Sequence, residues 1–347
     1  MMTVQVDAMA GVARDVEFRA AKPDDAEAIA DLYDTVYHGR YPIAECTDPA
    51  LTRRILQADN HIWMIAVADD MVVGSSVARP EPINSTCELG RAAVRMEYAG
   101  RGNFALLFEA TVEQAIAQPR NEMIYGYARS ERARYLFERI VYRVHWTGTD
   151  GGMHRVGDTR EEHLIGGSFN PRHQPVRVVP ANMPVVSGSR IEQELAAMSG
   201  RAVTGEYPYA LSGRGPVDFV HETSWGRVGY TLFEPSGALV VGELEAEDPV
   251  ACRRLLHETV EQAPVPVEHV TLYALADKRS FIETLCTPVD DGNRFCASAY
   301  LPGWHTDGTA RYDCVTLTQR RDRRRPVSLG LDERVRALHA SLPAAYR

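Results

Sequence analysis

The sequence lacks any run of about 18 consecutive apolar residues, the length that a membrane-spanning helix requires. Its first residues, MMTVQVDAMAGVARD, contain neither a basic start nor a continuous apolar stretch, so they do not read as a secretion signal. The six cysteines form no CxxC pair and show no spacing typical of zinc ligands. These absences predict a reduced, cytoplasmic protein without a membrane partner.

Several catalytic and binding motifs are also missing. There is no GxSxG elbow, no complete Walker loop, and no HxxxH or HExxH pattern. The histidines His145, His154, His163 and His173 are too scattered along the chain to predict a metal site. A formal net charge of −9 argues against a nucleic-acid partner, and the basic run QRRDRRRP (319–326) is expected to cap a strand or lie in solvent.

What the sequence does contain is material for two ordinary globular domains. It has 347 residues, of which 45% are hydrophobic and 24% charged. The proline-rich stretch 170–189 shows no amphipathic period and is the best linker candidate. We therefore predict a first domain over 16–169, a second over 190–320, and a C-terminal basic run and helix over 321–347.

The two halves share one order of predicted elements: helix, hairpin, helix, strand, helix, strand, strand. The string LLFEATVEQA (106–115) also recurs as LLHETVEQA (255–263), on the helix that follows the hairpin in each half. A chance match is conceivable in helices rich in Glu and Ala, but the equal position favours duplication. The sequence thus predicts a tandem of one fold.

The stretch EYAGRGNFALLFEA (97–110) places two glycines and an arginine directly before a helical apolar pattern. A helix N-terminus exposes unpaired N–H groups, which attract phosphates, and glycines let the backbone approach an anion closely. On these residues alone, a plain strand-to-helix turn is an equal alternative, because one GxG is a weak signal.

In its context the loop resembles that of the GNAT superfamily, the acyl-CoA-dependent N-acyltransferases, whose loop reads Arg/Gln-x-x-Gly-x-Gly/Ala. Gly102 keeps the central glycine, whereas Ala99 and Phe104 depart from the pattern. The resemblance covers about residues 16–169. It implies an α+β fold, two tandem GNAT-like domains each with a mixed, mostly antiparallel sheet flanked by helices, and acetyl-CoA or another acyl-CoA as co-substrate. The implied coenzyme A contacts are Ala92, Ala93, Val94, Gly100, Arg101, Gly102, Asn103, Phe104, Ala105 and Ser130.

The resemblance also implies a catalytic position at Glu88, eleven residues before Ala99, where a glutamate accepts the proton of the amine. The alternative is a surface glutamate on an alternating strand. Where many members carry a tyrosine that protonates the departing thiolate, this sequence has Phe137. Tyr135 lies roughly 200° around the same helix and is not expected to substitute, so the general acid is unassigned.

The second half departs further from the family. Its equivalent loop, residues 245–252, carries three carboxylates, and Asp248 with Pro249 predicts an N-cap and a first-turn proline. We therefore expect no coenzyme A there. The run AYLPGWHTDG (299–308) holds Tyr300, Trp304 and His305, for which a packed segment is favoured over a ligand-binding lip.

These observations predict an enzyme that transfers an acetyl or other short acyl group to an amine of a small molecule, in specialised metabolism. One alternative is a non-catalytic acyl-CoA binder in which the nucleotide is structural or regulatory. Another keeps the fold but uses acyl carrier protein as a partner.

Overall fold

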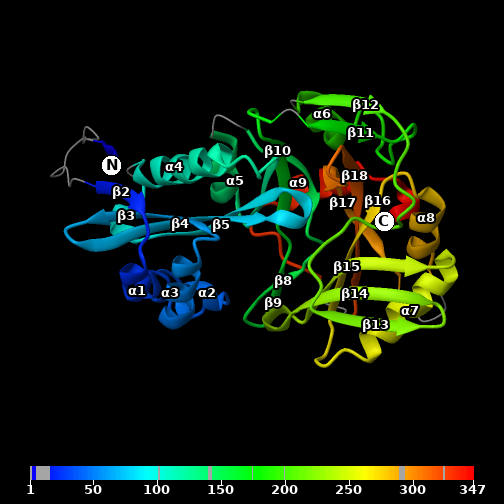
Figure 1. The fold of residues 1–347 in the computed structure, drawn as a ribbon, viewed down its shortest axis with the longest axis horizontal. Coiled ribbons are helices and arrows are strands. Elements are labelled where there is room, and N and C mark those ends of the chain that lie inside the picture. The colour runs from blue at the N-terminus through cyan, green and yellow to red at the C-terminus, as the bar shows by residue number, and fades with distance from the viewer. Residues whose placement is uncertain are drawn as a thin grey trace. The chain divides into compact units, whose positions relative to one another are not determined.

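The computed structural model describes residues 2–4, 16–100, 102–139, 143–173, 175–198, 200–288, 294–322 and 325–347 (Figure 1). The chain divides into two compact units. Unit 1 comprises residues 1–82 and 86–126, and unit 2 comprises residues 83–85 and 127–347. Among the described residues, no helix is both long and apolar enough to cross a membrane.

Unit 1 is built on one sheet with the strand order β1-β2-β3-β4-β5-β6. Neighbouring strands are antiparallel except β5 and β6, which are parallel and connected through α4. The elements are β1 (Met2–Val4), β2 (Val16–Ala20), α1 (Ala26–Tyr37), α2 (Ala44–Thr47), α3 (Pro49–Ala58), β3 (Ile62–Ala68), β4 (Met71–Glu81), β5 (Thr86–Val94), α4 (Asn103–Ala117) and β6 (Met123–Ala128), with 3-10 turns at Pro23–Asp25, Pro82–Asn84 and Met96–Tyr98.

Helices cover both faces of this sheet. Trp63 and Ile65 of β3 pack with α1, whereas Met64 and Ala66, which alternate with them, pack with Leu107 of α4. Burial on both faces explains why β3 reads as a nearly continuous apolar run rather than as an alternating one. Figure 1 shows α1, α2 and α3 on one side of β3 and β4 and α4 on the other.

Unit 2 contains a larger sheet with the order β10-β7-β17-β18-β16-β15-β14-β13, in which only β15 and β16 pair in parallel along this path. β11 pairs in parallel with β12 and β18, and β8 and β9 form a separate ribbon. The elements are α5 (Glu131–Arg139), β7 (His145–Thr149), β8 (His154–Val156), β9 (Thr159–Glu161), β10 (Leu164–Phe169), β11 (Val176–Val179), α6 (Arg190–Ala197), β12 (Arg201–Thr204), β13 (Phe219–Thr223), β14 (Gly226–Phe233), β15 (Ala238–Ala246), α7 (Pro249–Glu261), β16 (His269–Leu275), α8 (Arg279–Cys286), β17 (Cys296–Thr306), β18 (Arg311–Arg320) and α9 (Asp332–Ala340), with 3-10 turns at Glu234–Ser236 and Ala344–Tyr346.

The mixed α/β architecture with a mostly antiparallel sheet was predicted from the sequence. The structure adds a strand, β11, inside the stretch 170–189 that was predicted as a linker. This strand is held by pairing with β18 and by the buried ion pair of Arg177 with Asp313, at 2.7 Å. The run 299–308 lies mostly within β17, and Tyr300, Trp304 and His305 are buried, as the packed alternative predicted. The predicted domain boundaries stay a prediction.

Candidate active site

The first feature of the site is a strand edge without a partner. β5 pairs with β4 from Thr86 to Val94, but its parallel pairing with β6 extends only from Thr86↔Met123 to Leu89↔Gly126. Within the described part of unit 1, the stretch from Gly90 to Val94 therefore has no strand on its β6 side. It contains Ala92, Ala93 and Val94, the positions for which the sequence predicted contacts with pantetheine.

A β-bulge bends β5 at the start of this open stretch. Arg91 and Ala92 together face Ser76, and Arg91 has a φ of 46°, which is uncommon for a residue with a side chain. Tyr33 donates its hydroxyl to the Arg91 carbonyl, and Tyr37 donates to the Ala92 carbonyl at 3.0 Å. Because α1 satisfies both carbonyls, the bulge is held by packing on one face while the outer edge stays open.

The loop after β5 adopts the conformation that its glycines permit. Gly100 has a φ of 79° and Gly102 a φ of 80°, and a Cβ at either position would meet nothing within 4 Å. The glycines are therefore required by backbone conformation and not by crowding. Arg101 lies outside the described residues. Phe104, in the first turn of α4, stacks on Phe108 with the ring centroids 6.4 Å apart.

The N-terminus of α4 lacks a side-chain cap. Gly102 is its N-cap, and the first turn, which runs from Asn103 through Ala105, holds no acidic residue. In the corresponding place on α7, Asp248 accepts hydrogen bonds from the amides of Val250 and Ala251 at 2.7 and 2.8 Å. The first-turn amides of α4 can therefore bind an anion, whereas those of α7 are already satisfied. The cap predicted for the second half is confirmed.

The predicted contact Ser130 has a local role in unit 2. It lies just before α5, where its hydroxyl accepts a hydrogen bond from the Ala133 amide at 3.3 Å. This arrangement is a helix cap. A coenzyme A contact at Ser130 stays a prediction.

Glu88 lies at the centre of a group of charged side chains. Arg79 reaches one Glu88 oxygen at 2.7 Å, and a nitrogen of Arg91 lies 3.6 Å from the other. Arg79 also binds Glu81 at 2.8 Å, and Arg91 binds Glu45 of α2 at 2.9 Å. We call this group, completed by a tyrosine on β6, the carboxylate–arginine cluster; its members are Glu45, Arg79, Glu81, Glu88, Arg91 and Tyr125.

The cluster has one more carboxylate than it has guanidinium groups. Burial opposes the charge of Arg79 and Arg91, but the neighbouring carboxylates outweigh burial and raise both pKa values. Burial raises the pKa of Glu81, and the charge of Arg79 only partly offsets that effect. Tyr125 donates its hydroxyl to Glu81 at 2.9 Å.

His61, directly before β3, was not singled out from the sequence. Its Nδ1 lies 2.7 Å from the side-chain oxygen of Asn60, while its buried Nε2 has no hydrogen-bond partner among the described residues. Burial lowers the pKa of His61 and so favours the neutral ring, while the charges of Glu45 and Arg91 shift this pKa in opposite directions. If Nδ1 carries the proton, Nε2 is free to accept one.

Nothing on α5 replaces the missing tyrosine. Phe137 is buried and packs edge-on against Trp146, with the ring centroids 5.6 Å apart. Tyr135 is 53% exposed, on another face of the helix, as the helical period predicted. The general acid therefore remains unassigned among the described residues of α5.

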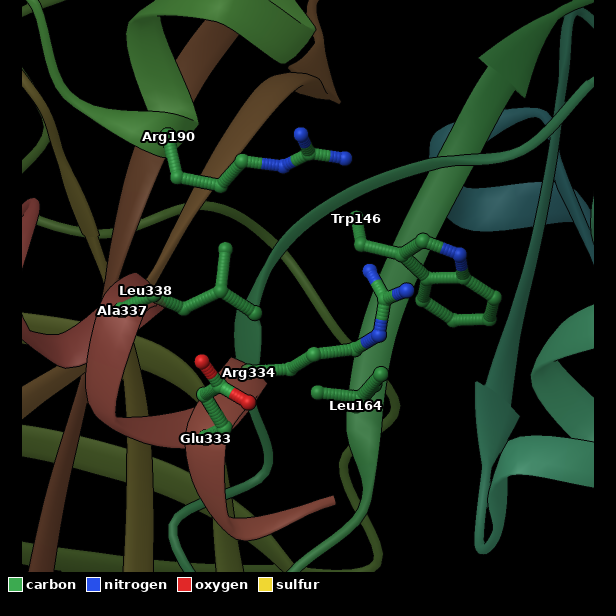
Figure 2. Close-up of a pocket in the computed structure, with 7 residues that line it drawn as sticks. All are labelled: Trp146, Leu164, Arg190, Glu333, Arg334, Ala337 and Leu338. Carbon is green, nitrogen blue, oxygen red and sulfur yellow. The ribbon is translucent and has the colours of Figure 1, made fainter.

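Unit 2 contains a separate cavity of about 350 Å³. Figure 2 shows it between the strands of Trp146 and Leu164 and the helix that carries Glu333, Arg334, Ala337 and Leu338, with Arg190 at its rim. Both arginines are already paired, Arg190 with Glu194 and Arg334 with Glu131. None of the residues predicted as site residues lines this cavity.

No family model and no curated protein matches the chain. About half of the chain is similar to solved structures of GNAT acetyltransferases. The ribosomal-protein-S5-alanine acetyltransferase from Vibrio fischeri is 14% identical, and the match covers 49% of this chain and 100% of that one, with a TM-score of 0.40. A putative acetyltransferase of the GNAT family from Desulfovibrio desulfuricans is 19% identical, with coverages of 44% and 98% and a TM-score of 0.37. A variant of spermidine N-acetyltransferase from Vibrio cholerae is 13% identical, with coverages of 45% and 95% and a TM-score of 0.38.

Proposed function

We propose that the chain is an N-acyltransferase that moves an acetyl or other short acyl group from acyl-CoA to an amine of a small molecule. The observation that carries the proposal is the open edge of β5 from Gly90 to Val94, which leads through Gly100 and Gly102 to the uncapped start of α4. An extended ligand with amide groups can pair with such an edge as an added strand does. Its pyrophosphate would then meet the α4 amides.

In the reaction, the amine nitrogen attacks the thioester carbonyl, so a C–N bond forms and the C–S bond breaks. Glu88 accepts the proton that the amine loses, in keeping with its position on β5. His61 is a second candidate for this role, because its Nε2 is buried and without a partner among the described residues. The thiolate takes its proton from water, which a thiol with an ordinary pKa of about 8.5 permits.

We further propose that unit 2 contains a second, degenerate copy of the fold. β13, β14 and β15 pair antiparallel and β15 pairs in parallel with β16 across α7, as β3, β4, β5 and β6 do across α4. The proposed boundaries are 16–169 and 190–320. Because Asp248 occupies the amides at the start of α7, this copy is not expected to bind a pyrophosphate.

A non-catalytic acyl-CoA binder is the second candidate function. Two observations favour it: both Glu88 oxygens already face guanidinium groups, and position 137 carries a buried phenyl ring. A protein of this kind would bind acyl-CoA at the same strand edge and leave the thioester intact.

A turnover assay separates the two candidates. The purified protein is given acetyl-CoA and a panel of small amines, and release of the free thiol is followed over time. For an amine that is acetylated, Glu88→Gln is expected to lower turnover by about 10²- to 10⁴-fold while coenzyme A affinity stays within twofold. The matched control is Glu97→Gln, at an exposed position in the same region of the chain.

Equal rates for Glu88→Gln and the parent would show that Glu88 is not the general base. The same assay on His61→Gln would then test the second candidate for this role. If acetyl-CoA binds but none of the amines in the panel is acetylated, the result would support the non-catalytic candidate.

A further inference from the structure

The turn after β7 and the segment before β10 bring together three residues that no sequence motif connects. Asp150 directly follows β7, His154 begins β8, and His163 directly precedes β10. One ligand atom from each lies within 4.8 Å of the others. Two of the four histidines that are scattered along the sequence, His154 and His163, therefore lie in one group, because the β8–β9 ribbon returns the chain to its own start.

Two backbone amides hold one oxygen of Asp150, and the other oxygen faces the two histidines. Its Oδ1 accepts hydrogen bonds from the amides of Gly152 and His163, at 3.0 and 2.9 Å. Its Oδ2 lies 2.5 Å from Nδ1 of His154 and 3.9 Å from Nδ1 of His163. The turn itself is fixed, because Gly151 has a φ of 66° and a Cβ there would come within 2.5 Å of the side chain of Thr318.

The second ring nitrogen of His163, Nε2, is held by a carboxylate on the side of the ring away from Asp150. This nitrogen lies 3.2 Å from Oε2 of Glu161. Arg129 donates hydrogen bonds to both Glu161 oxygens, at 2.5 and 2.7 Å. A histidine that binds a metal almost always donates its second N–H to a carboxylate or carbonyl in this manner. The rings of His154 and His163 are stacked, with their centroids 4.4 Å apart.

A metal ion at this position would replace the hydrogen bond between Nδ1 of His154 and Oδ2 of Asp150, because a nitrogen that binds a metal must first lose its proton.

We propose that Asp150, His154 and His163 bind one divalent transition-metal ion of the zinc class, with Glu161 as the positioning residue for His163. Zinc bonds of about 2.0–2.1 Å place tetrahedral ligand atoms roughly 3.3 Å apart. The two distances from Asp150 Oδ2, 2.5 and 3.9 Å, lie on either side of that value, and the three ligand atoms lie within 4.8 Å of one another. Binding would therefore require the side chains to rotate about an ion placed between them. His154 is about one-third exposed, which leaves the fourth position to water or another small ligand.

The test is metal binding to the full chain, freed of any affinity tag and treated with a chelator. Zn²⁺ is titrated by calorimetry, Co²⁺ is followed by its visible absorption, and thermal melting is recorded with and without Zn²⁺. We expect one ion per chain, a Co²⁺ spectrum of a four-coordinate site, and a rise in melting temperature of a few degrees.

His154→Gln and His163→Gln should weaken binding by more than about 100-fold, and Glu161→Gln by about 10- to 100-fold. The control is His257→Gln, at an exposed position on α7, which should bind like the parent. Circular dichroism checks that each variant is folded; His154, at the edge of the cluster, is the substitution least disruptive to packing. The proposal is overturned if the parent protein binds no Zn²⁺ tighter than millimolar, or if His154→Gln binds as the control does. Either result would leave a metal-free hydrogen-bond network.

Discussion

At position 137 the protein places a phenyl ring where the resemblance implies a hydroxyl that could protonate a thiolate. The ring is buried against Trp146, so a hydroxyl added there would have to be accommodated in a packed core. A substitution at this position can therefore show whether the side chain serves packing or catalysis.

Phe137→Tyr is therefore expected to destabilise the protein by about 1–3 kcal/mol, the cost of burying a hydroxyl without a partner. Urea unfolding measures this, with Tyr135→Phe as the control, because that exposed position should change stability by less than about 0.5 kcal/mol. Unchanged stability together with a faster acyl transfer would show instead that the hydroxyl reaches the reacting sulfur.

His305 provides a prediction on pH. Burial lowers its pKa to about 4, helped by the charges of Arg214 and Arg311. Because the unfolded chain binds a proton near pH 6.5 and the folded chain does not, the stabilising contribution is complete above pH 6.5 and is lost as the pH falls toward 4. The free energy of unfolding should thus fall by at most about 1.4 kcal/mol per pH unit through this window.

The measurement is urea unfolding at pH 7.5, 6.0 and 5.0 for the parent and for His305→Gln. The variant should show a flatter dependence, and the difference between the two curves isolates this one group. Parallel curves would mean that His305 binds protons equally in the folded and the unfolded chain.

At the scale of elements, most helices and strands follow from the sequence because their signals are local. Asp248 with Pro249 begins α7 as the capping pattern predicted. The bulge at Arg91 and the end of the β5–β6 pairing at Leu89 could not be predicted in this way. They depend on how strands distant in the sequence meet.

The two crossover helices differ at their first turns, and this difference can be measured. Asp248→Ala removes the acceptor for two amides of α7 and should cost about 0.5–2 kcal/mol of stability. Coenzyme A affinity should not change, since the proposed site lies at α4. Chemical denaturation and calorimetry on the same variant test both parts, and a change in affinity would place part of the ligand at α7.

At the scale of the whole chain, the sequence predicted Glu88 and the glycine loop but not the side chains around Glu88. Glu45, Arg79 and Tyr125 come from α2, β4 and β6, and the fold of unit 1 alone brings them together. The Asp150–His154–His163 group was missed for the same reason, since its spacing matches no known metal motif. Patterns in the local sequence predict helices and strands. The two candidate sites form only through contacts between residues that are far apart in the sequence.

The central claim is that the chain binds one coenzyme A at the start of α4, and calorimetric titration with coenzyme A, supported by native mass spectrometry, tests it most directly. The parent should bind one equivalent. Gly102→Asp should abolish binding, because it places a carboxylate at the proposed pyrophosphate position. The matched control is Gly330→Asp, since Gly330 has a φ of 81° and equally open surroundings in unit 2. Two equivalents per chain, or binding that survives in Gly102→Asp, would contradict the claim.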